Sequence, residues 1–261
     1  MTGPGALLMR MQGVQLAFGD KKVLCGLDLS LQREETLVIM GQSGSGKSTL
    51  LRLLLGLLKA DAGSILFKDE EITTLPRRQL NRLRAMIGMV YQSSALLGSF
   101  TVGRNLAFPL EEISAKTSAE INAIVEAKLE LVGLADARDK LPDELSGGMR
   151  KRAGLARALV LEPELLLFDE PSAGLDPVNS AIINGLIIDL REKHHVTSIV
   201  VTHDMDSAFR VASRMLLLDE GRITEDAAPA AFRRSANPAV RKFLGHFSVP
   251  AKEASDADPQ K

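Results

Sequence analysis

The sequence predicts an α/β protein built on a parallel sheet, and three features of its pattern indicate this. Short apolar runs of strand length alternate with segments of helical character along much of the chain. The N-terminal region Leu7–Leu31 contains strand-like runs with no helix between them. Residues from about 101 to 160 are mostly helical in pattern and interrupt the alternation. Because strands separated by helices pair in parallel, the first feature predicts the core of the fold.

The parallel core is expected from a series of short buried strands. The first is Thr36–Gly41, with the sequence TLVIMG, and Lys47–Leu58 is expected to be the helix that follows it. Short, continuous apolar runs are typical of strands that are covered on both faces. The remaining strands of the predicted set are Ser64–Phe67, Met86–Tyr91, Leu165–Glu170, Thr197–His203 and Arg214–Gly221.

Three regions depart from this alternation. In the N-terminal region the turn GDKK, residues 19–22, joins two strand-like runs, and such a short connection favours antiparallel pairing. Residues 101–160 are expected to form a helical subdomain inserted into the sheet core. Together, residues 1–245 predict one domain, while the small and polar residues 246–261 predict a mobile C-terminal tail.

The composition limits the classes of protein to consider. A chain of 261 residues with 45% apolar residues can bury a core, and its net charge of −1 argues against nucleic acid as a partner. The longest apolar runs, such as Leu53–Leu58, are far shorter than the ~18–20 residues of a membrane span. The N-terminus lacks the pattern of a secretory signal. The single cysteine, Cys25, cannot form an internal disulfide, so we expect a protein of the reducing cytosol.

The segment GQSGSGKS, residues 41–48, follows an expected strand and precedes an expected helix. It matches the spacing G-x-x-x-x-G-K-[ST] of loops that bind nucleotide phosphates. Its glycines let backbone N–H groups turn toward phosphate oxygens, Lys47 can reach the β- and γ-phosphates, and Ser48 can ligate Mg²⁺. A glycine-rich turn without this role is the alternative, which the strand–loop–helix context disfavours. The residues expected to contact the nucleotide here are Gly41, Gln42, Ser43, Gly44, Ser45, Gly46, Lys47, Ser48 and Thr49.

A pair of carboxylates follows the apolar run LLLF, residues 165–168. Asp169 ends this expected strand and is suited to holding Mg²⁺. Glu170 follows and is suited to accepting a proton from an attacking water. Without the phosphate-binding loop, a solvated strand end would be the better interpretation of the two residues.

A second glycine cluster, LSGGMRKR at residues 145–152, lies between the loop and the carboxylates. Ser146, Gly147 and Gly148 open an expected helix, where bare N–H groups and a hydroxyl suit an anion. With the other two motifs, this cluster resembles the signature of the ATP-binding subunits of ABC transporters, over about residues 7–245. The resemblance implies an ABC-type nucleotide-binding domain with a RecA-like parallel sheet core, an N-terminal antiparallel β subdomain and an inserted helical subdomain. It also implies a head-to-tail homodimer, in which the signature of one chain serves the γ-phosphate of the ATP held by its partner.

The same resemblance assigns four further residues. Phe18 matches the aromatic residue that stacks on adenine, with a core phenylalanine as the alternative. Gln92 matches a glutamine that senses Mg²⁺ and water and links to the membrane subunits. Asp176 matches a residue that helps to join the protomers, and His203 matches a histidine that touches the γ-phosphate. The implied catalytic residues are Lys47, Gln92, Glu170 and His203, and the implied Mg²⁺ ligands are Ser48, Gln92 and Asp169.

Three segments resemble one branch of this family, the ATPases of MCE-type transporters, which move phospholipids or related lipids between membranes. The Mla phospholipid system is the best-known member. The segments are LSGGMRKRAGLARAL at residues 145–159, Tyr91–Leu110 and Asn237–Leu244. Met149 stands where the family usually has glutamine, which leaves the local nucleotide geometry open but keeps every residue needed for hydrolysis.

The resemblance to this branch implies an ATPase subunit on the cytoplasmic face of the inner membrane. It would power phospholipid movement through a separate integral membrane permease, with an MCE-domain lipid-binding protein and a small regulatory subunit as further partners. Two alternatives stay open. One is the ATPase subunit of an importer for amino acids, polyamines or ions, and the other is a soluble ABC ATPase such as an iron–sulfur assembly factor.

Two remaining features concern charge and the C-terminal region. The basic run of residues 150–152 is interpreted as a solvated helix face or as part of the phosphate environment.

An apolar stripe on a short helix is predicted from the spacing of Val240, Phe243, Leu244 and Phe247. Such a short helix is stable only when it packs on another surface. Docking on its own domain is one outcome. The resemblance to the lipid-transport branch instead suggests contact with the other protomer, so that truncation after residue 235 would leave a folded monomer but weaken dimerisation.

Overall fold

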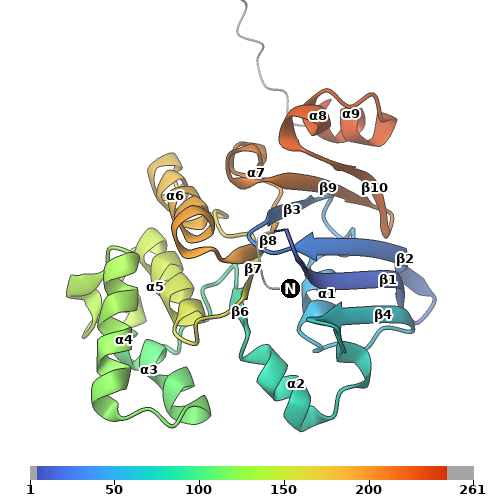
Figure 1. The fold of residues 1–261 in the computed structure, drawn as a ribbon. Helices are drawn as coiled ribbons and strands as arrows, with labels where there is room; N and C mark the ends of the chain where they lie inside the picture. Colours follow the sequence, from blue (N-terminus) through green and yellow to red (C-terminus); the bar gives the residue numbers. More distant parts are fainter. Residues whose placement is uncertain (1–4, 246–261) are drawn as a thin grey trace, which may run out of the picture.

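The structure, a computed structural model that describes residues 5–245, contains two sheets with helices packed around them (Figure 1). The larger sheet has the strand order β10-β9-β3-β8-β7-β6 and is parallel except at its β9–β10 edge. The smaller sheet, β2-β1-β4-β5, is antiparallel. The predicted α/β fold class is confirmed. The strands are β1 Leu7–Phe18, β2 Lys21–Gln32, β3 Thr36–Met40, β4 Ala62–Phe67, β5 Glu70–Glu71, β6 Ile87–Val90, β7 Leu165–Asp169, β8 Thr197–Val201, β9 Arg214–Asp219 and β10 Arg222–Ala227.

The large sheet is covered on both faces, which explains why its strands carry uninterrupted apolar sequences. Along β3, Leu37 and Ile39 point into a core between the two sheets, whereas Val38 and Met40 point into a core beneath the helices. Successive side chains of a strand alternate between faces, so every residue of this strand is buried. Helix α1, Lys47–Leu54, contributes its buried leucines to the core between the sheets. The phosphate-binding loop therefore lies between a fully buried strand and a fixed helix.

The helices of residues 102–159 form a group of their own, at the lower left of Figure 1 and remote from the antiparallel sheet. Thr117 and Glu120 cap the second of them reciprocally, which satisfies N–H groups at its start. The helices are α1 Lys47–Leu54, α2 Arg77–Arg84, α3 Val102–Ile113, α4 Ser118–Leu131, α5 Gly147–Leu159, α6 Pro177–His194, α7 Met205–Val211, α8 Pro229–Arg233 and α9 Pro238–Gly245, with 3₁₀ turns at Ile72–Thr74, Ala135–Ala137 and Pro142–Glu144.

Two expectations about the sheet core need correction. The strand expected at residues 64–67 is β4, which pairs with β1 in the antiparallel sheet and not with the parallel core. Its apolar run is also compatible with an inner strand of the smaller sheet, where it lies between β1 and β5, so the pattern did not distinguish the two. The helix expected to end at residue 58 ends at Leu54. Gly56 takes a left-handed φ of 61°, a conformation that stops an α-helix.

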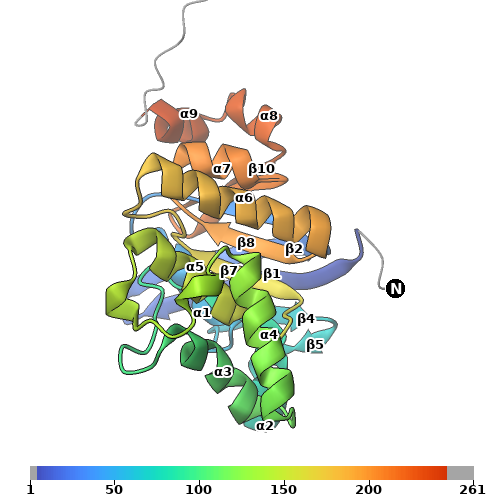
Figure 2. The same cartoon turned by 90° about the vertical axis from the view of Figure 1, so that its left-hand side faces the viewer.

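Helix α9 packs on its own domain, which is the first of the two outcomes expected for its apolar stripe. Val240 is fully buried and Phe243 is 5% exposed, and both belong to the core beneath the helices. Leu244 packs against the same core. In both views α9 lies beside α8, at the β10 edge of the large sheet (Figures 1 and 2). Phe247 and the predicted tail at residues 246–261 lie outside the described residues.

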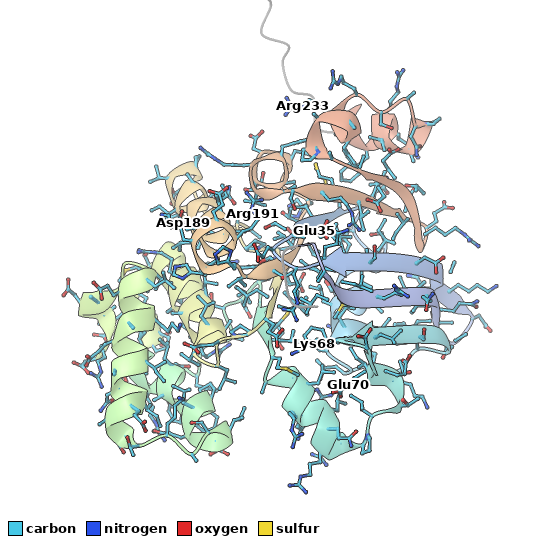
Figure 3. All side chains as sticks on the ribbon, viewed as in Figure 1. Glu35, Lys68, Glu70, Asp189, Arg191 and Arg233 are labelled. Atoms are coloured by element: carbon cyan, nitrogen blue, oxygen red, sulfur yellow. The ribbon has the colours of Figure 1, made fainter. Side chains whose placement is uncertain are left out.

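Ion pairs connect segments that are distant in sequence. Glu35, labelled in Figure 3 at the junction of β2 and β3, accepts a hydrogen bond from Arg214 Nη1 of β9 at 2.8 Å. Glu164, directly before β7, pairs with Lys68 at 2.5 Å and with Arg33 at 2.8 Å. The first contact joins the starts of the neighbouring strands β3 and β9, and the other two join the start of β7 to the ends of β2 and β4 in the smaller sheet. Between residues 5 and 245, no helix combines the length and the apolar character that crossing a membrane requires.

Candidate functional site

A cavity of about 810 Å³ opens where β3, β6, β7 and β8 reach their carboxyl ends. Such an edge of a parallel sheet is the usual place for a ligand in α/β proteins. The cavity brings together most of the residues that the sequence motifs single out, from segments more than a hundred residues apart. Its predicted lining residues are Phe18, Gly41, Gln42, Ser43, Gly44, Gly46, Lys47, Ser48, Thr49, Gln92, Asp169, Glu170 and His203, and those not predicted are Lys21, Val23, Val201 and Phe243.

The loop after β3 requires glycine at particular positions for geometric reasons. A Cβ added to Gly41 would lie 2.3 Å from the Leu218 carbonyl oxygen, a distance that no side chain can tolerate. Gly46 has a φ of 104° and caps the start of α1 without any side-chain hydrogen bond. The first N–H groups of α1 are therefore available to an anion, and the helix dipole favours negative charge there.

Lys47, the first residue of α1, carries a largely buried ammonium group. It donates hydrogen bonds to the carbonyl oxygens of Gly41 at 2.8 Å and Gln42 at 2.9 Å. The phosphate-binding loop is therefore folded around the Lys47 side chain. Burial lowers the pKa of Lys47, and the nearby carboxylates of Glu170 and Asp169 act in the opposite direction. A cation held at this position can neutralise phosphate charge in a partly dehydrated site.

Asp169 and Ser48 provide a set of hard oxygen ligands at the base of the cavity. The Ser48 hydroxyl donates to Asp169 Oδ1 at 3.3 Å. Burial raises the pKa of Asp169, while the hydrogen bond from Ser48 lowers it. A hydroxyl and a carboxylate side by side fit Mg²⁺, which takes oxygen ligands and completes its shell with phosphate oxygens and water. The residues present therefore fit the metal that the sequence motif implies.

Glu170 is held at the end of β7 by contacts on both of its carboxylate oxygens. Thr202 Oγ1 donates to Oε2 at 3.1 Å, and the backbone N–H of His203 donates to the same oxygen at 3.2 Å. The ring nitrogen Nδ1 of His203 lies 2.8 Å from Oε1. The backbone N–H of Glu170 also bonds to the Val201 carbonyl oxygen at 2.8 Å. These contacts orient a carboxylate at the wall of the cavity, where it can accept a proton.

The residues of the second glycine cluster lie outside this cavity. Ser146 is exposed and caps α5, because its hydroxyl accepts a hydrogen bond from the Met149 N–H at 3.2 Å. Asp176 caps α6 by accepting from the N–H groups of Val178 and Asn179, both at 2.9 Å. The cavity of the same chain is therefore lined by none of the four residues Ser146, Gly147, Gly148 and Asp176. A site that a second protomer completes requires this arrangement.

Gly148 lies against the start of α6. A Cβ added there would approach Asn179 Oδ1 to 2.1 Å, and Asn179 is itself fixed, since its side-chain amide donates to Asp176 Oδ2 at 2.5 Å. A Cβ added to Gly147 would meet only Leu175, at 3.8 Å. The starts of α5 and α6 are therefore in close contact at the second glycine and not at the first.

The sequence profile of the family described as "ABC transporter" matches residues 24–173, more than half of the chain. The chain belongs to the ABC transporter family. A "probable ribonucleotide transport ATP-binding protein mkl" from Mycobacterium leprae is 39% identical, over 92% of this chain and 70% of its own length. The "intermembrane phospholipid transport system ATP-binding protein MlaF" from Escherichia coli K12 is 38% identical, over 92% of this chain and 89% of its own length.

A solved structure gives the same assignment. A dimeric ATP-binding cassette in a post-hydrolysis state, bound to ADP and Pi, aligns with a TM-score of 0.78 and 28% identity, over 85% of this chain and 99% of that one. This ABC protein is an ATPase with ATP as its substrate. Cassettes of its family dimerise and work with a membrane permease.

In this ABC ATPase, the interpretation of the basic run as a solvated face is wrong for its middle residue. Lys151 is buried, and its Nζ donates to the Glu170 carbonyl oxygen at 3.2 Å. Arg152 Nη1 donates to the carbonyl oxygens of Val132 and Gly133, both at 3.0 Å. Only Arg150 is exposed, and it too bonds to the backbone, at Leu145. Lys151 thus contacts the main chain of Glu170, which lines the cavity, but does not itself line the cavity.

Met149 and Thr202 are two further residues of this ABC ATPase whose positions the sequence did not reveal. Met149 packs against the core beneath the helices, so an apolar side chain is accommodated where the family usually has glutamine. Thr202 is fully buried and supports the Glu170 carboxylate. Its position directly before His203 in VVTHD was the signal that could have identified it.

Proposed function

We propose that this ABC ATPase powers the movement of lipid, in particular phospholipid, through a separate membrane permease. The assignment of ATP hydrolysis as the energy source rests on one observation, which is that Lys47, Asp169 and Glu170 line the same cavity. The lipid cargo is supported by the relative MlaF, whose name describes intermembrane phospholipid transport and of which this chain covers 89%. The segments around Met149 and at residues 91–110 and 237–244 support the same branch.

ATP binding is assigned to the loop after β3 and to residues around it. The N–H groups at the start of α1 and the Lys47 ammonium would hold the β- and γ-phosphates. Phe18, which is 52% exposed and lines the cavity, would stack on adenine. Ser48, Asp169 and Gln92 would hold Mg²⁺, which when bound neutralises charge on the phosphate oxygens.

Hydrolysis is assigned to the carboxylate at the end of β7. Glu170 would accept a proton from the attacking water, because its oxygens are fixed by Thr202 and His203. His203 would contact the γ-phosphate from the same edge of the cavity. Lys47 would stabilise the charge that develops on the transferred phosphoryl group.

The site would be completed by a second copy of the chain. Ser146, Gly147 and Gly148 of the partner would close over the γ-phosphate, and Asp176 would lie near the junction of the two protomers. The exposure of Ser146 and its separation from the cavity of its own chain support this arrangement. The solved relative bound to ADP and Pi is a dimer, which also supports it.

The same proposal includes the partners and location. An integral membrane permease would hold the ATPase at the cytoplasmic face of the inner membrane, with an MCE-domain lipid-binding protein and a small regulatory subunit in the assembly. An importer for another small solute is the second candidate. The name of one relative refers to ribonucleotide transport, which supports a cargo other than lipid. A soluble ABC ATPase of the iron–sulfur assembly type is the third, and it would carry no permease.

Purification of the tagged full chain from membranes tests the proposal. We expect a multi-span permease and bound phospholipid in the purified complex. A complex with a permease but no lipid, stimulated by a soluble cargo, would favour an importer, and the absence of any permease would favour the soluble class.

Glu170→Gln tests the hydrolytic assignment in the same complex. The amide is nearly isosteric but cannot take a proton, so ATP binding should persist while turnover stops and an ATP-bound dimer accumulates. Size-exclusion chromatography would detect that dimer. A variant with normal turnover would refute the role of Glu170.

A further inference from the structure

The main chain of Glu170 has an unusual conformation. Its φ is 51°, in the left-handed region that residues with a side chain seldom adopt. Such a conformation costs on the order of 1 kcal/mol and persists only where surrounding contacts impose it. The turn matters because it directs the carboxylate toward Thr202 and His203 rather than onward along β7. A group that holds this turn therefore controls the direction of the carboxylate.

Lys151 supplies one of the contacts that hold this turn. Its Nζ donates to the Glu170 carbonyl oxygen at 3.2 Å, and the residue is only 7% exposed. A nearly buried ammonium is costly without hydrogen bonds and opposite charge. Among residues 5–245, the Glu170 carbonyl is the hydrogen-bond acceptor that Lys151 reaches. Burial lowers the pKa of Lys151, and the nearby carboxylates of Glu170 and Asp169 act in the opposite direction. The mechanism assigned above does not use this lysine.

The position of Lys151 on α5 gives the contact a second consequence. Helix α5 begins directly after Ser146, and Lys151 lies five residues beyond that serine, or about 7.5 Å along the helix axis. Helix α5 packs against β6, which pairs with β7, the strand that Glu170 follows. One rigid helix thus joins the residues assigned to the partner's ATP to the carboxylate assigned to the ATP of its own chain.

We propose that Lys151 is a positioning residue, which holds the Glu170 turn in its catalytic orientation through the hydrogen bond to the Glu170 carbonyl oxygen. It does not contact the reacting atoms. The inference rests on the proposed role of Glu170 as the proton acceptor. Because the contact comes from the signature helix, it also links the closure of one composite site to the carboxylate of the other.

Lys151→Met tests the inference in the full chain assembled with its permease. The methionine side chain is apolar and similar in length to that of lysine, but it cannot donate a hydrogen bond. We expect kcat to fall by about 10- to 100-fold, the loss typical of a small displacement of a catalytic group. KM for ATP should stay within about twofold, because the phosphate-binding loop is untouched. Lys151→Arg, which restores a donor of at least equal reach, should recover most of the turnover.

The controls separate folding and the role of Glu170 from the role of the lysine. Lys193→Met makes the same change at a lysine that is 67% exposed and should leave kcat unaltered. If Lys151→Met does not fold, Lys151→Gln, whose amide is one bond too short to reach the carbonyl, should show the same loss of kcat. A kcat of Lys151→Met within about threefold of the parent would overturn the inference. So would a proportional rise in KM, or a folded Lys151→Arg variant as slow as the methionine variant.

Glu170→Gln in the same assay distinguishes the two hypotheses. If the glutamine variant is inactive while Lys151→Met is normal, only the inference about Lys151 fails. If the glutamine variant turns over ATP normally, the proposed role of Glu170 fails first.

Discussion

Replacing Phe243 by alanine should destabilise the isolated ATPase, because α9 belongs to the core of its own domain. Phe243 is 5% exposed and packs beneath the helices with the fully buried Val240 and Phe232. Large-to-small substitutions of buried phenylalanine cost about 3–5 kcal/mol, and we take about 3 kcal/mol because Phe243 also lines the cavity. For chains of this size, about 3 kcal/mol corresponds to a fall in Tm of about 6–12 °C.

Thermal unfolding without nucleotide, followed by circular dichroism, measures this effect, since bound ATP would itself raise Tm. Phe18→Ala is the matched control. It removes a phenylalanine that is 52% exposed, and surface substitutions of this kind change stability by about 0.5 kcal/mol or less. The dimer content of the assembled complex is measured alongside by sedimentation.

An unchanged Tm for Phe243→Ala with a clear loss of dimer would refute the reasoning. In that case α9 would act mainly between protomers, as the resemblance to the lipid-transport branch suggests. Truncation after residue 235 makes the same distinction. On the present structure it should lower the stability of the monomer and not leave it intact.

Three further outcomes follow from the site. Lys47→Ala should reduce ATP turnover by ~10²–10³-fold or more, through the loss of charge stabilisation on the phosphates, and near-normal steady-state turnover would contradict the loop assignment. Phe18→Ala should raise KM for ATP by about two- to tenfold, because stacking on adenine is lost, and it should leave kcat unchanged. An unchanged KM would refute the proposed contact between Phe18 and adenine. Dimers that combine a Lys47→Ala chain with a Ser146→Arg chain should keep one intact composite site and exceed either mutant homodimer in turnover and nucleotide occupancy. Equal loss in all three dimers would mean that the signature serves its own chain.

The parts of the fold and site that the sequence predicts are those set by local rules. A fully buried β3, a loop that only glycine can form and carboxylates at a strand end all follow from residues adjacent in the chain. Parallel pairing then brings Gly41, Gln92, Asp169 and His203 to one edge without further information.

The parts that the sequence does not predict depend on packing between distant segments. The sequence predicts that Lys151, within a basic run, is a surface residue. In the structure its position on α5 brings it to the Glu170 carbonyl oxygen, directly after β7. The sequence predicts that Phe243 belongs to an apolar stripe on a short helix. Only the position of α9 beside the large sheet shows which residues cover that stripe. The strand at residues 64–67 has the pattern of a core strand, and its partner β1 decides its sheet. In each case the deciding contact is with a segment distant in sequence, which the local pattern does not identify.

The close contact between Gly148 and Asn179 affects how substitutions in the signature should be interpreted. Any side chain at Gly148 collides with the start of α6 within the same chain, so such a variant disturbs a helix junction before any phosphate is involved. A loss of ATPase activity at this position is therefore expected even from a protein whose signature touches no nucleotide. Gly147 has room for a methyl group, with only Leu175 at 3.8 Å. Gly147→Ala is thus the diagnostic substitution of the pair, because its effect on turnover reports on what lies across the protomer boundary.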